Sequence, residues 1–273
     1  MLSFPNAKIN IGLNITSKRS DGYHNLETVF YPIPIKDVLE VKLLSNSNKK
    51  WLFQIVGQNF EGKPEDNLVV KVFCDMQKEF DLPPVDIYLQ KKIPTGAGLG
   101  GGSSDAAFMM KTLNEMFNIG LSTEDMERRI ATYGADCAFF IKDSCCFASG
   151  IGDKLIPINF SLKGKCIITI KPSLAISTRE AYSGIIPHTP QNRIFDTIKL
   201  PIDSWKEYIT NDFEHHLFLR YPQLAAIKQT LYDLRAEYAS LSGSGSVVYG
   251  IFNRRIENIE KVFNDCLVFQ HNL

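Results

Sequence analysis

The sequence lacks a net charge, a paired-cysteine motif and any long apolar run. Its 273 residues include 30 basic and 30 acidic side chains, with 17 basic against 19 acidic in residues 1–155 and 13 against 11 in 156–273. Proteins that bind nucleic acids or anionic membranes in general carry a clear basic excess, so this balance argues against both classes. An anionic ligand would therefore have to be held by local geometry.

The six cysteines form no C-x-x-C pair and lie among apolar residues, which indicates reduced thiols. The N-terminal segment includes Pro5, Asn6 and Lys8, where a signal peptide would need apolar residues. No run of about 18 apolar residues predicts a membrane-spanning helix, and no group of His, Cys and Asp has zinc-ligand spacing. We therefore expect a cytoplasmic protein whose partners are small molecules.

Strand and helix patterns are interleaved along the chain, which is typical of an α+β protein. Lys8 to Ile15 alternates polar and apolar residues and predicts a half-buried strand with a polar face. Helical spacing begins at Asn67, after Ser103-Ser104-Asp105, and again at Ser122, each time at residues that favour a helix N-cap. Other strands are expected at 26–35, 38–45, 51–56, 85–89, 166–170 and 246–252, and other helices within 204–236 and over 254–265.

Glycine is not abundant overall, yet five of the seven residues at 96–102 are glycine. This segment lies between an expected strand and an expected helix. Glycines allow close approach of a ligand to backbone amides, and a helix N-terminus adds unpaired N–H groups and a partial positive charge. The combination binds phosphate without a basic surface, and the hydroxyls of Ser103 and Ser104 can serve phosphate or Mg²⁺.

Other interpretations of the glycine segment have to be weighed. No lysine precedes the two serines, which excludes a Walker A loop. Gly96, Gly98 and Gly101 satisfy G-x-G-x-x-G, but the acidic residues at the spacing of a dinucleotide-binding fold, Glu124 and Asp125, lie at a helix start. The segment could also be a flexible loop that binds no ligand, although flexible linkers seldom lie between a strand and a capped helix.

Three motifs in the same order resemble the superfamily of galactokinase, homoserine kinase, mevalonate kinase and phosphomevalonate kinase. They are residues 5–10, 94–104 and 241–246. The resemblance implies a two-domain α/β kinase fold, with an N-terminal ATP-binding and catalytic domain (1–155), a C-terminal substrate-side domain (156–273) and an active site in the cleft between them. It also implies ATP contacts from Asn67, Lys91, Pro94, Gly96, Ala97, Gly98, Leu99, Gly100, Gly101, Gly102, Ser103 and Ser104. Asn67 by itself also fits a simple N-cap.

Within this superfamily, residues 8–13, 19–24 and 134–140 resemble the kinases of the non-mevalonate isoprenoid pathway that act on 4-diphosphocytidyl-2-C-methyl-D-erythritol, a cytidine diphosphate ester. The resemblance implies that Tyr23 and Tyr182 stack on the two faces of cytosine and that His24 binds its edge. Asn10 and Thr178 are implied as further substrate contacts. Tyr182 alone also fits a core-facing helix aromatic. Relatives are Pro-rich around Tyr182, whereas this chain has Arg179 and Glu180, so the backbone contacts there stay open.

Phosphoryl transfer needs positioning and charge stabilisation, and a carboxylate near the acceptor hydroxyl can take its proton. Asp136 is the candidate base, because it interrupts the chain between a predicted helix and an apolar segment. Lys8 is the candidate partner, which would keep Asp136 ionised and stabilise the transferred phosphoryl group. The residues alone also allow a helix-capping aspartate and an exposed strand lysine. Mg²⁺ is expected with ATP, but no carboxylate is assigned to it.

Three alternatives remain open at this point. A superfamily member acting on a homoserine-type or mevalonate-type alcohol would not need the aromatic set of Tyr23, His24 and Tyr182. A non-catalytic ligand-binding member would not need Lys8 or Asp136. A nicotinamide-dependent oxidoreductase would use the glycine segment for its dinucleotide.

Overall fold

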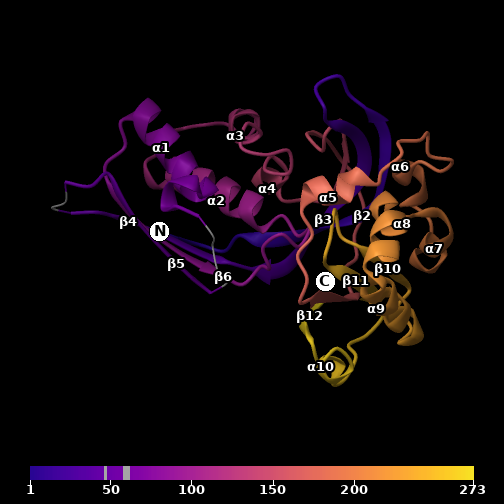
Figure 1. The fold of residues 1–273 in the computed structure, drawn as a ribbon. Coiled ribbons are helices and arrows are strands. Elements are labelled where there is room, and N and C mark those ends of the chain that lie inside the picture. Colours follow the sequence, from indigo (N-terminus) through magenta and orange to yellow (C-terminus); the bar gives the residue numbers. More distant parts are fainter. Residues whose placement is uncertain (46–47, 58–61) are drawn as a thin grey trace. The chain divides into compact units, whose positions relative to one another are not determined.

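The computed structural model describes residues 1–45, 48–57 and 62–273, and the chain folds into two compact units that interleave along the sequence (Figure 1). Unit 1 comprises residues 1–7, 35–95 and 100–144, and unit 2 comprises residues 8–34, 96–99 and 145–273. The sequence suggested a single boundary after residue 155, whereas these two units each combine separate segments of the chain. The units interleave because strands from residues 6–36 share a sheet with strands formed after residue 145.

Unit 1 is built on a four-stranded mixed sheet with helices against one face (Figure 1). Its strand order is β1 (Leu2–Ser3), β4 (Val38–Leu43), β6 (Val85–Lys91) and β5 (Trp51–Gly57), and only the β5–β6 pair is parallel. The remaining elements are η1 (Pro64–Asp66), α1 (Leu68–Phe80), α2 (Gly101–Met116), α3 (Thr123–Ile130) and α4 (Phe139–Lys142).

Helix α1 forms where the apolar spacing predicts it. The side chain of Asn67 accepts a hydrogen bond of 2.9 Å from the backbone N–H of Val69 and so caps the helix. Val69, Val72, Phe73 and Met76 are buried along one face. The N-cap interpretation of Asn67 is therefore confirmed, and its contact with ATP stays a prediction.

Helix α2 begins earlier than the sequence suggested. Its N-cap is Gly100, at φ 70, and Ser104 N donates to Gly100 O at 2.9 Å. Ser103 and Ser104 therefore lie inside the first helical turn rather than at its cap. Glycine adopts the left-handed conformation at little cost, so Gly100 can end the loop and cap the helix. No side-chain hydroxyl caps this helix.

Unit 2 contains two four-stranded sheets. The first has the order β2 (Asn6–Lys18), β3 (His24–Lys36), β7 (Cys146–Ser149) and β8 (Lys154–Pro157). The second is antiparallel, with the order β10 (Tyr238–Leu241), β11 (Val248–Phe252), β9 (Cys166–Pro172) and β12 (Cys266–Asn272).

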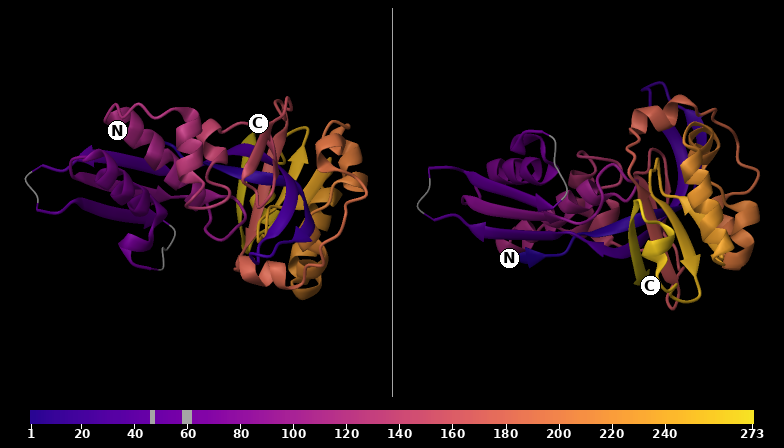
Figure 2. Two further views of the ribbon diagram at one scale, coloured as in Figure 1. Left: turned by 90° about the horizontal axis from the view of Figure 1, so that it is seen from above. Right: turned by 60° about the horizontal axis from the view of Figure 1, so that its bottom comes forward.

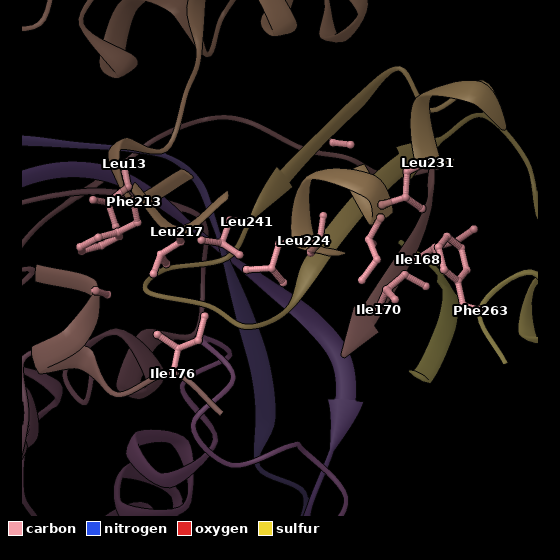
Figure 3. Close-up of a cluster of buried hydrophobic side chains, with 14 of the residues drawn as sticks. Leu13, Ile168, Ile170, Ile176, Phe213, Leu217, Leu224, Leu231, Leu241 and Phe263 are labelled. Carbon is pink, nitrogen blue, oxygen red and sulfur yellow. The ribbon is translucent and has the colours of Figure 1, made fainter. Parts of the chain in front are cut away.

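The helices of unit 2 lie mostly between β9 and β10 in the sequence. They are α5 (Thr178–Ser183), α6 (Ile194–Thr197), η2 (Ile202–Ser204), α7 (Trp205–Tyr208), α8 (Asp212–Arg220), α9 (Pro222–Asp233) and α10 (Ile259–Val262). Helices α8 and α9 lie along one face of the second sheet, as Figure 2 shows from two directions. Side chains from these helices and from β9 form the apolar core drawn in Figure 3, which includes Phe213, Leu224, Leu231, Ile168 and Ile170.

The segment 254–265 was expected to be one helix, and that prediction is wrong. Only Ile259–Val262 is helical, and the chain continues into the edge strand β12, whose residues pair with all of β9 from Cys166 to Pro172. The local spacing favours a helix, but pairing with the exposed edge of β9 satisfies a full row of backbone groups. Tertiary pairing of this kind leaves no local signal in the sequence.

Strand β2 was expected to be half-buried, and the structure buries both of its faces. Every residue from Asn6 to Ile15 is buried, including the polar side chains of Lys8, Asn10 and Asn14. Lys8 is 3% exposed, so the interpretation as an exposed strand lysine is wrong. Buried polar groups of this kind require hydrogen-bond partners, and these partners define the candidate site.

Over residues 1–45, 48–57 and 62–273, no helix is both long and apolar enough to cross a lipid bilayer. The same residues contain no group of three or more His, Cys, Asp and Glu side chains that could hold a metal ion. All six cysteines are free thiols, three of them buried.

Candidate active site

In unit 2 a chain of polar groups holds the amine of Lys8. Lys8 Nζ donates to Asn10 Oδ1 at 2.6 Å and lies 4.8 Å from the centre of the Phe30 ring. Asn10 Nδ2 donates to Thr28 Oγ1 at 3.0 Å, and the Thr28 hydroxyl donates to Gly12 O at 2.6 Å. The amine is thus directed by two neighbouring strands, β2 and β3.

The three sequence motifs meet in unit 2 through backbone contacts. Asn10 N donates to Ser242 Oγ at 3.3 Å, and Ser242 Oγ donates to Gly98 O at 2.9 Å. Lys8 N donates to Leu99 O at 3.0 Å. A Cβ atom on Gly98 would lie 1.9 Å from Ser242 O, so only glycine fits this crossing. The candidate catalytic strand and both glycine segments therefore share one hydrogen-bonded core.

The glycine loop combines an open backbone with buried anchors. Gly96, Gly98 and Gly100 all have positive φ (58, 76 and 70), which glycine adopts readily. Ala97 and Leu99 alternate with them and are 2% and 1% exposed. The loop is therefore pinned by its two apolar side chains, and it leads directly into α2, a helix of 16 residues. Loop amides followed by a helix N-terminus form an arrangement that binds phosphate.

Lys91 belongs to a buried ion cluster in unit 1. Its amine donates to Asp37 and, at 2.5 Å, to Asp105 Oδ2. Asp37 Oδ1 also accepts from the backbone N–H groups of Lys92 and Ile93. Burial raises the pKa of Asp105 to about 8, against the opposing pull of Lys91. Burial alone would lower the pKa of Lys91, but the attraction of both carboxylates outweighs it and the pKa is raised.

The family resemblance implied a contact between Lys91 and ATP, and in the structure the amine of Lys91 pairs with Asp37 and Asp105. A Cβ on Gly101, at the start of α2, would lie 3.3 Å from Lys91 Nζ, so the cluster lies directly beneath the first turn of that helix. The cluster thus supports the end of the glycine loop from inside unit 1. A direct contact between Lys91 and the nucleotide stays a prediction.

Asp136 lies in the turn between α3 and α4, where the sequence placed it. Helix α4 has Ala138 as its N-cap, so Asp136 does not cap that helix. The following residue, Cys137, is buried and hydrogen-bonded by the Ser103 hydroxyl, and burial raises the pKa of its thiol to about 11. The first turn of α2 and the turn that carries Asp136 are therefore neighbours within unit 1.

Two of the three predicted base-binding aromatics are stacked in unit 2. The rings of His24 and Tyr182 lie 4.9 Å apart at an angle of 24°, and Tyr182 also meets the edge of Phe213. Tyr23 is 62% exposed. Burial and the nearby charge of Lys18 lower the pKa of His24, so its ring is neutral near pH 7 and offers one donor and one acceptor. His24 begins β3 rather than lying in the turn, and Tyr182 packs on the core as well as on His24.

The segment before Tyr182 is held by its own ion pair. Thr178, exposed, is the first residue of α5, and Ser177 caps this helix by accepting from Glu180 N at 3.1 Å. The Glu180 carboxylate accepts from Tyr221 Oη at 2.5 Å and from Arg220 Nε at 2.9 Å. Glu180 thus ties α5 to the end of α8.

Sequence reasoning missed Thr28, Asp37 and Asp105. A signal existed for Thr28, because it alternates with Leu26 and Phe30 and so shares their buried face. No comparable signal marks Asp37 and Asp105, which lie far apart in the sequence and both pair with Lys91.

Comparison with known proteins places this architecture in a family. The family model described as "GHMP kinases N terminal domain" matches residues 67–144, and "GHMP kinases C terminal" matches 198–267. The 4-diphosphocytidyl-2-C-methyl-D-erythritol kinase of Bacteroides fragilis is 51% identical over 273 residues, which is 100% of both chains. The kinase of the same name from Bacteroides thetaiotaomicron is 54% identical over 252 residues, 92% of each chain. The chain belongs to this kinase family.

Solved structures agree with the family assignment. The crystal structure of a 4-(cytidine 5'-diphospho)-2C-methyl-D-erythritol kinase superposes with a TM-score of 0.82 at 26% identity, covering 100% of this chain and 99% of the other. A mevalonate kinase superposes with a TM-score of 0.71 at 14% identity, covering 99% and 98%, and at that identity it shows the fold alone. The predicted fold class, a two-part α+β kinase fold of this superfamily, is confirmed.

Proposed function

We propose that the chain transfers the γ-phosphoryl group of ATP to the 2-hydroxyl of 4-diphosphocytidyl-2-C-methyl-D-erythritol, a step of the non-mevalonate isoprenoid pathway. Relatives of that name match it over the full length at 51% identity. The structural observation that carries the proposal is the hydrogen-bonded core of unit 2, where Lys8 and the loop residue Leu99 share a hydrogen bond. That core joins a directed amine to a phosphate-binding backbone.

In this proposal the glycine loop holds the phosphates of ATP. The peptide groups at residues 96–102 and the first turn of α2 offer N–H donors, and the helix adds a partial positive charge. Backbone donors serve an anion as well as a basic side chain would, which suits a chain of net charge +0. The buried Ala97 and Leu99 keep these donors in place before the nucleotide binds.

Asp136 and Lys8 would carry the chemical step. The Asp136 carboxylate would accept the proton of the substrate hydroxyl as it attacks phosphorus. The Lys8 ammonium would stabilise negative charge on the transferred phosphoryl group, since its donors are fixed in direction before the reaction. Asp136 lies in unit 1 and Lys8 in unit 2, and each is positioned within its own unit by the contacts described above.

The cytidine half of the substrate would be bound by the aromatic residues of unit 2. The exposed ring of Tyr23 and the ring of Tyr182 offer flat faces for stacking. The neutral His24 ring can donate to or accept from the edge of cytosine. Asn10 and Thr178 remain proposed contacts of the methylerythritol part, although the structure also gives Asn10 a partner in Lys8.

Mg²⁺ fits the start of α2. The hydroxyl of Ser104 and Oδ1 of Asp105 are buried and have no hydrogen-bond partner among the described residues. Mg²⁺ takes oxygen ligands, keeps several waters and usually needs only one or two protein groups besides the phosphates. Ser104 is therefore the residue that would hold the ion beside the glycine loop. When bound, Mg²⁺ would neutralise charge on the phosphates.

The cytoplasm contains ATP and keeps thiols reduced, and all six cysteines of this chain are free thiols. We therefore propose that the enzyme works there, on small-molecule substrates.

An ATP-consumption assay with three acceptors tests the proposed function. The purified chain is given ATP, Mg²⁺ and either the cytidyl substrate, homoserine or mevalonate. We expect turnover only with the cytidyl substrate. Turnover with homoserine or mevalonate alone would assign the chain to another branch of the superfamily, and binding without turnover would favour a non-catalytic member. An absorbance change with a nicotinamide cofactor would instead indicate an oxidoreductase.

A further inference from the structure

Thr28 lies in the middle of β3 and is 0% exposed. Its hydroxyl has two neighbours, Gly12 O at 2.6 Å and Asn10 Nδ2 at 3.0 Å. A threonine hydroxyl has a single hydrogen, and a carbonyl oxygen can only accept one. The hydrogen of Thr28 is therefore committed to Gly12 O, and toward Asn10 the hydroxyl can only accept.

This direction fixes the side-chain amide of Asn10. A carboxamide presents two donors at its nitrogen and an acceptor at its oxygen, on opposite sides. The nitrogen must face the accepting hydroxyl of Thr28, so the oxygen faces Lys8 Nζ, at 2.6 Å. The reversed amide would place two acceptors together at Thr28 and two donors together at Lys8. The Thr28 hydroxyl and the Lys8 ammonium thus require the same one of the two amide orientations.

The main chain of Asn10 is already held by other groups. Its N–H donates to Ser242 Oγ at 3.3 Å, and its carbonyl accepts from Tyr249 Oη at 2.9 Å. A Cβ on Gly243 would lie 3.1 Å from Asn10 Oδ1, so Gly243 is a close neighbour of the amide oxygen. Rotation of the amide is the freedom that remains, and Thr28 controls it.

We propose that Thr28 is a positioning residue for phosphoryl transfer, because its hydroxyl orients the Asn10 amide and, through that amide, the amine of Lys8. Thr28 touches neither the substrate nor the transferred group in this scheme. The inference deepens the proposed function and rests on it, since Lys8 is assigned its chemical role there.

The test begins with Thr28→Val, which removes the hydroxyl and keeps the shape of the side chain. We expect kcat to fall about 10- to 100-fold, the scale of a slightly misplaced catalytic group. KM for ATP should change by no more than about threefold, because no contact proposed for ATP is removed. Thr28→Ser, which keeps the hydroxyl, should recover most of the lost kcat.

Thr169→Val is the matched control. Thr169 lies on β9 in the same unit and is 1% exposed, and its hydroxyl has no hydrogen-bond partner among the described residues. The same change therefore removes a buried hydroxyl without breaking a polar chain, and kcat should stay within about twofold of wild type. A comparable loss of kcat in Thr169→Val would show a general effect of the substitution and overturn the proposal.

A double-mutant cycle separates positioning from general damage. Once Asn10→Ala has removed the amide, Thr28→Val should lower kcat no further, because Thr28 acts through that amide. Independent effects of the two changes on kcat would overturn the proposal. Thr28→Ala is the second variant if Thr28→Val does not fold. If neither folds, Thr28 is needed for folding and the proposal is overturned.

A readout without substrate distinguishes failure of the inference from failure of the proposed function. The ¹H–¹⁵N signals of the Asn10 carboxamide, identified by their loss in Asn10→Ala, should exchange slowly with solvent in the wild type. In Thr28→Val we expect these two signals to shift and exchange faster, with no such change in Thr169→Val. Unchanged signals would overturn the positioning role. A wild-type protein that shows the expected signals but no turnover of the cytidyl substrate would instead overturn the proposed function.

Discussion

Two buried lysines in this molecule are held by different kinds of neighbour. Lys91 in unit 1 is 5% exposed and ion pairs with Asp37 and Asp105. Lys8 in unit 2 is 3% exposed and is held by the amide of Asn10 and the ring of Phe30. Asp37 and Asp105 hold the first amine as part of the fold. The Asn10 amide oxygen directs the second amine, which also lies over the Phe30 ring.

The difference shows that burial alone does not identify a functional lysine. A buried ion pair contributes to the stability of the fold. If one partner is removed, the other charge stays buried without compensation, and the unfolding free energy falls. An amine whose direction is fixed in advance is suited to stabilise charge that appears only during a reaction. We therefore expect substitutions at the two sites to separate stability from rate.

The largest effect on kcat should come from Asp136→Asn. This change compares the carboxylate of Asp136 with the buried carboxyl groups of the Lys91 cluster. Asn keeps the size of the side chain but cannot accept the proton, so kcat should fall by about 10²–10⁴-fold. The unfolding free energy should change little, because Asp136 lies in a half-buried turn and does not cap helix α4. Steady-state kinetics and urea unfolding measure both quantities. A folded Asp136→Asn protein with near-normal kcat would remove Asp136 from its proposed role.

Lys91→Met should show the opposite pattern. It leaves two carboxylates buried without their cation, which costs about 3–5 kcal/mol of unfolding free energy for a buried pair. The low end is expected, since Asp37 keeps its two backbone donors and Asp105, with a pKa of about 8, can stay protonated. Urea unfolding measures the loss, and KM for ATP shows whether Lys91 also contacts the nucleotide.

Two further lysine variants bracket that result. Lys92→Met changes the exposed neighbour of Lys91 and should cost less than about 0.5 kcal/mol. Lys8→Met should lower kcat by about 10²–10³-fold, the scale of losing one fixed donor, with a smaller loss of stability than Lys91→Met. If Lys8→Met destabilised the fold as much as Lys91→Met did, the distinction between the two lysines would be lost.

Tyr23→Ala tests whether Tyr23, an exposed side chain of unit 2, binds the cytosine of the substrate. Tyr23 is 62% exposed, so its removal should hardly alter stability. Loss of one stacking ring should weaken binding of the cytidyl substrate by about 1–3 kcal/mol and raise its KM accordingly. KM for ATP should not move. Equal losses for both substrates would place Tyr23 outside the base-binding site.

The stability of the chain should also depend on pH through the ion cluster of Lys91. The pKa of Asp105 is raised to about 8 in the folded chain, whereas an unfolded aspartate titrates near 3.9. Between these values the folded state holds a proton that the unfolded state has lost, so the unfolding free energy falls as pH rises toward 8. Asp105→Asn should remove this fall, roughly 1 kcal/mol per pH unit between pH 6 and 8. Parallel pH curves for the two proteins would contradict it.

The sequence predicted the parts of the fold that have a local signal. The spacing of Val69, Val72 and Met76 marks α1, and the alternation from Lys8 marks the strand β2. The order of the three motifs indicated the kinase superfamily, and the contacts of Ser242 and Leu99 show how the motifs meet. Local spacing and composition are enough for such features.

The parts that could not be predicted depend on distant residues. Burial of both faces of β2 depends on other segments packing against its polar side, and Asn10 and Thr28 meet only across paired strands. The Lys91 cluster joins side chains that lie 54 and 14 positions away in the sequence. Helix α10 stops at Val262 because the next segment adds a strand to β9. Each is decided by tertiary packing, which the local pattern does not contain.

The crossing of Gly98 with Ser242 limits how this enzyme can be re-engineered. A side chain at Gly98 would meet the Ser242 carbonyl at 1.9 Å, and that carbonyl belongs to backbone rather than to a movable side chain. A mutant library that diversifies the glycine loop alone should therefore return glycine at this position. Variants with another residue at Gly98 should be sought by varying residues 94–104 and 241–246 together, because the backbone of Ser242 leaves no room for a side chain there.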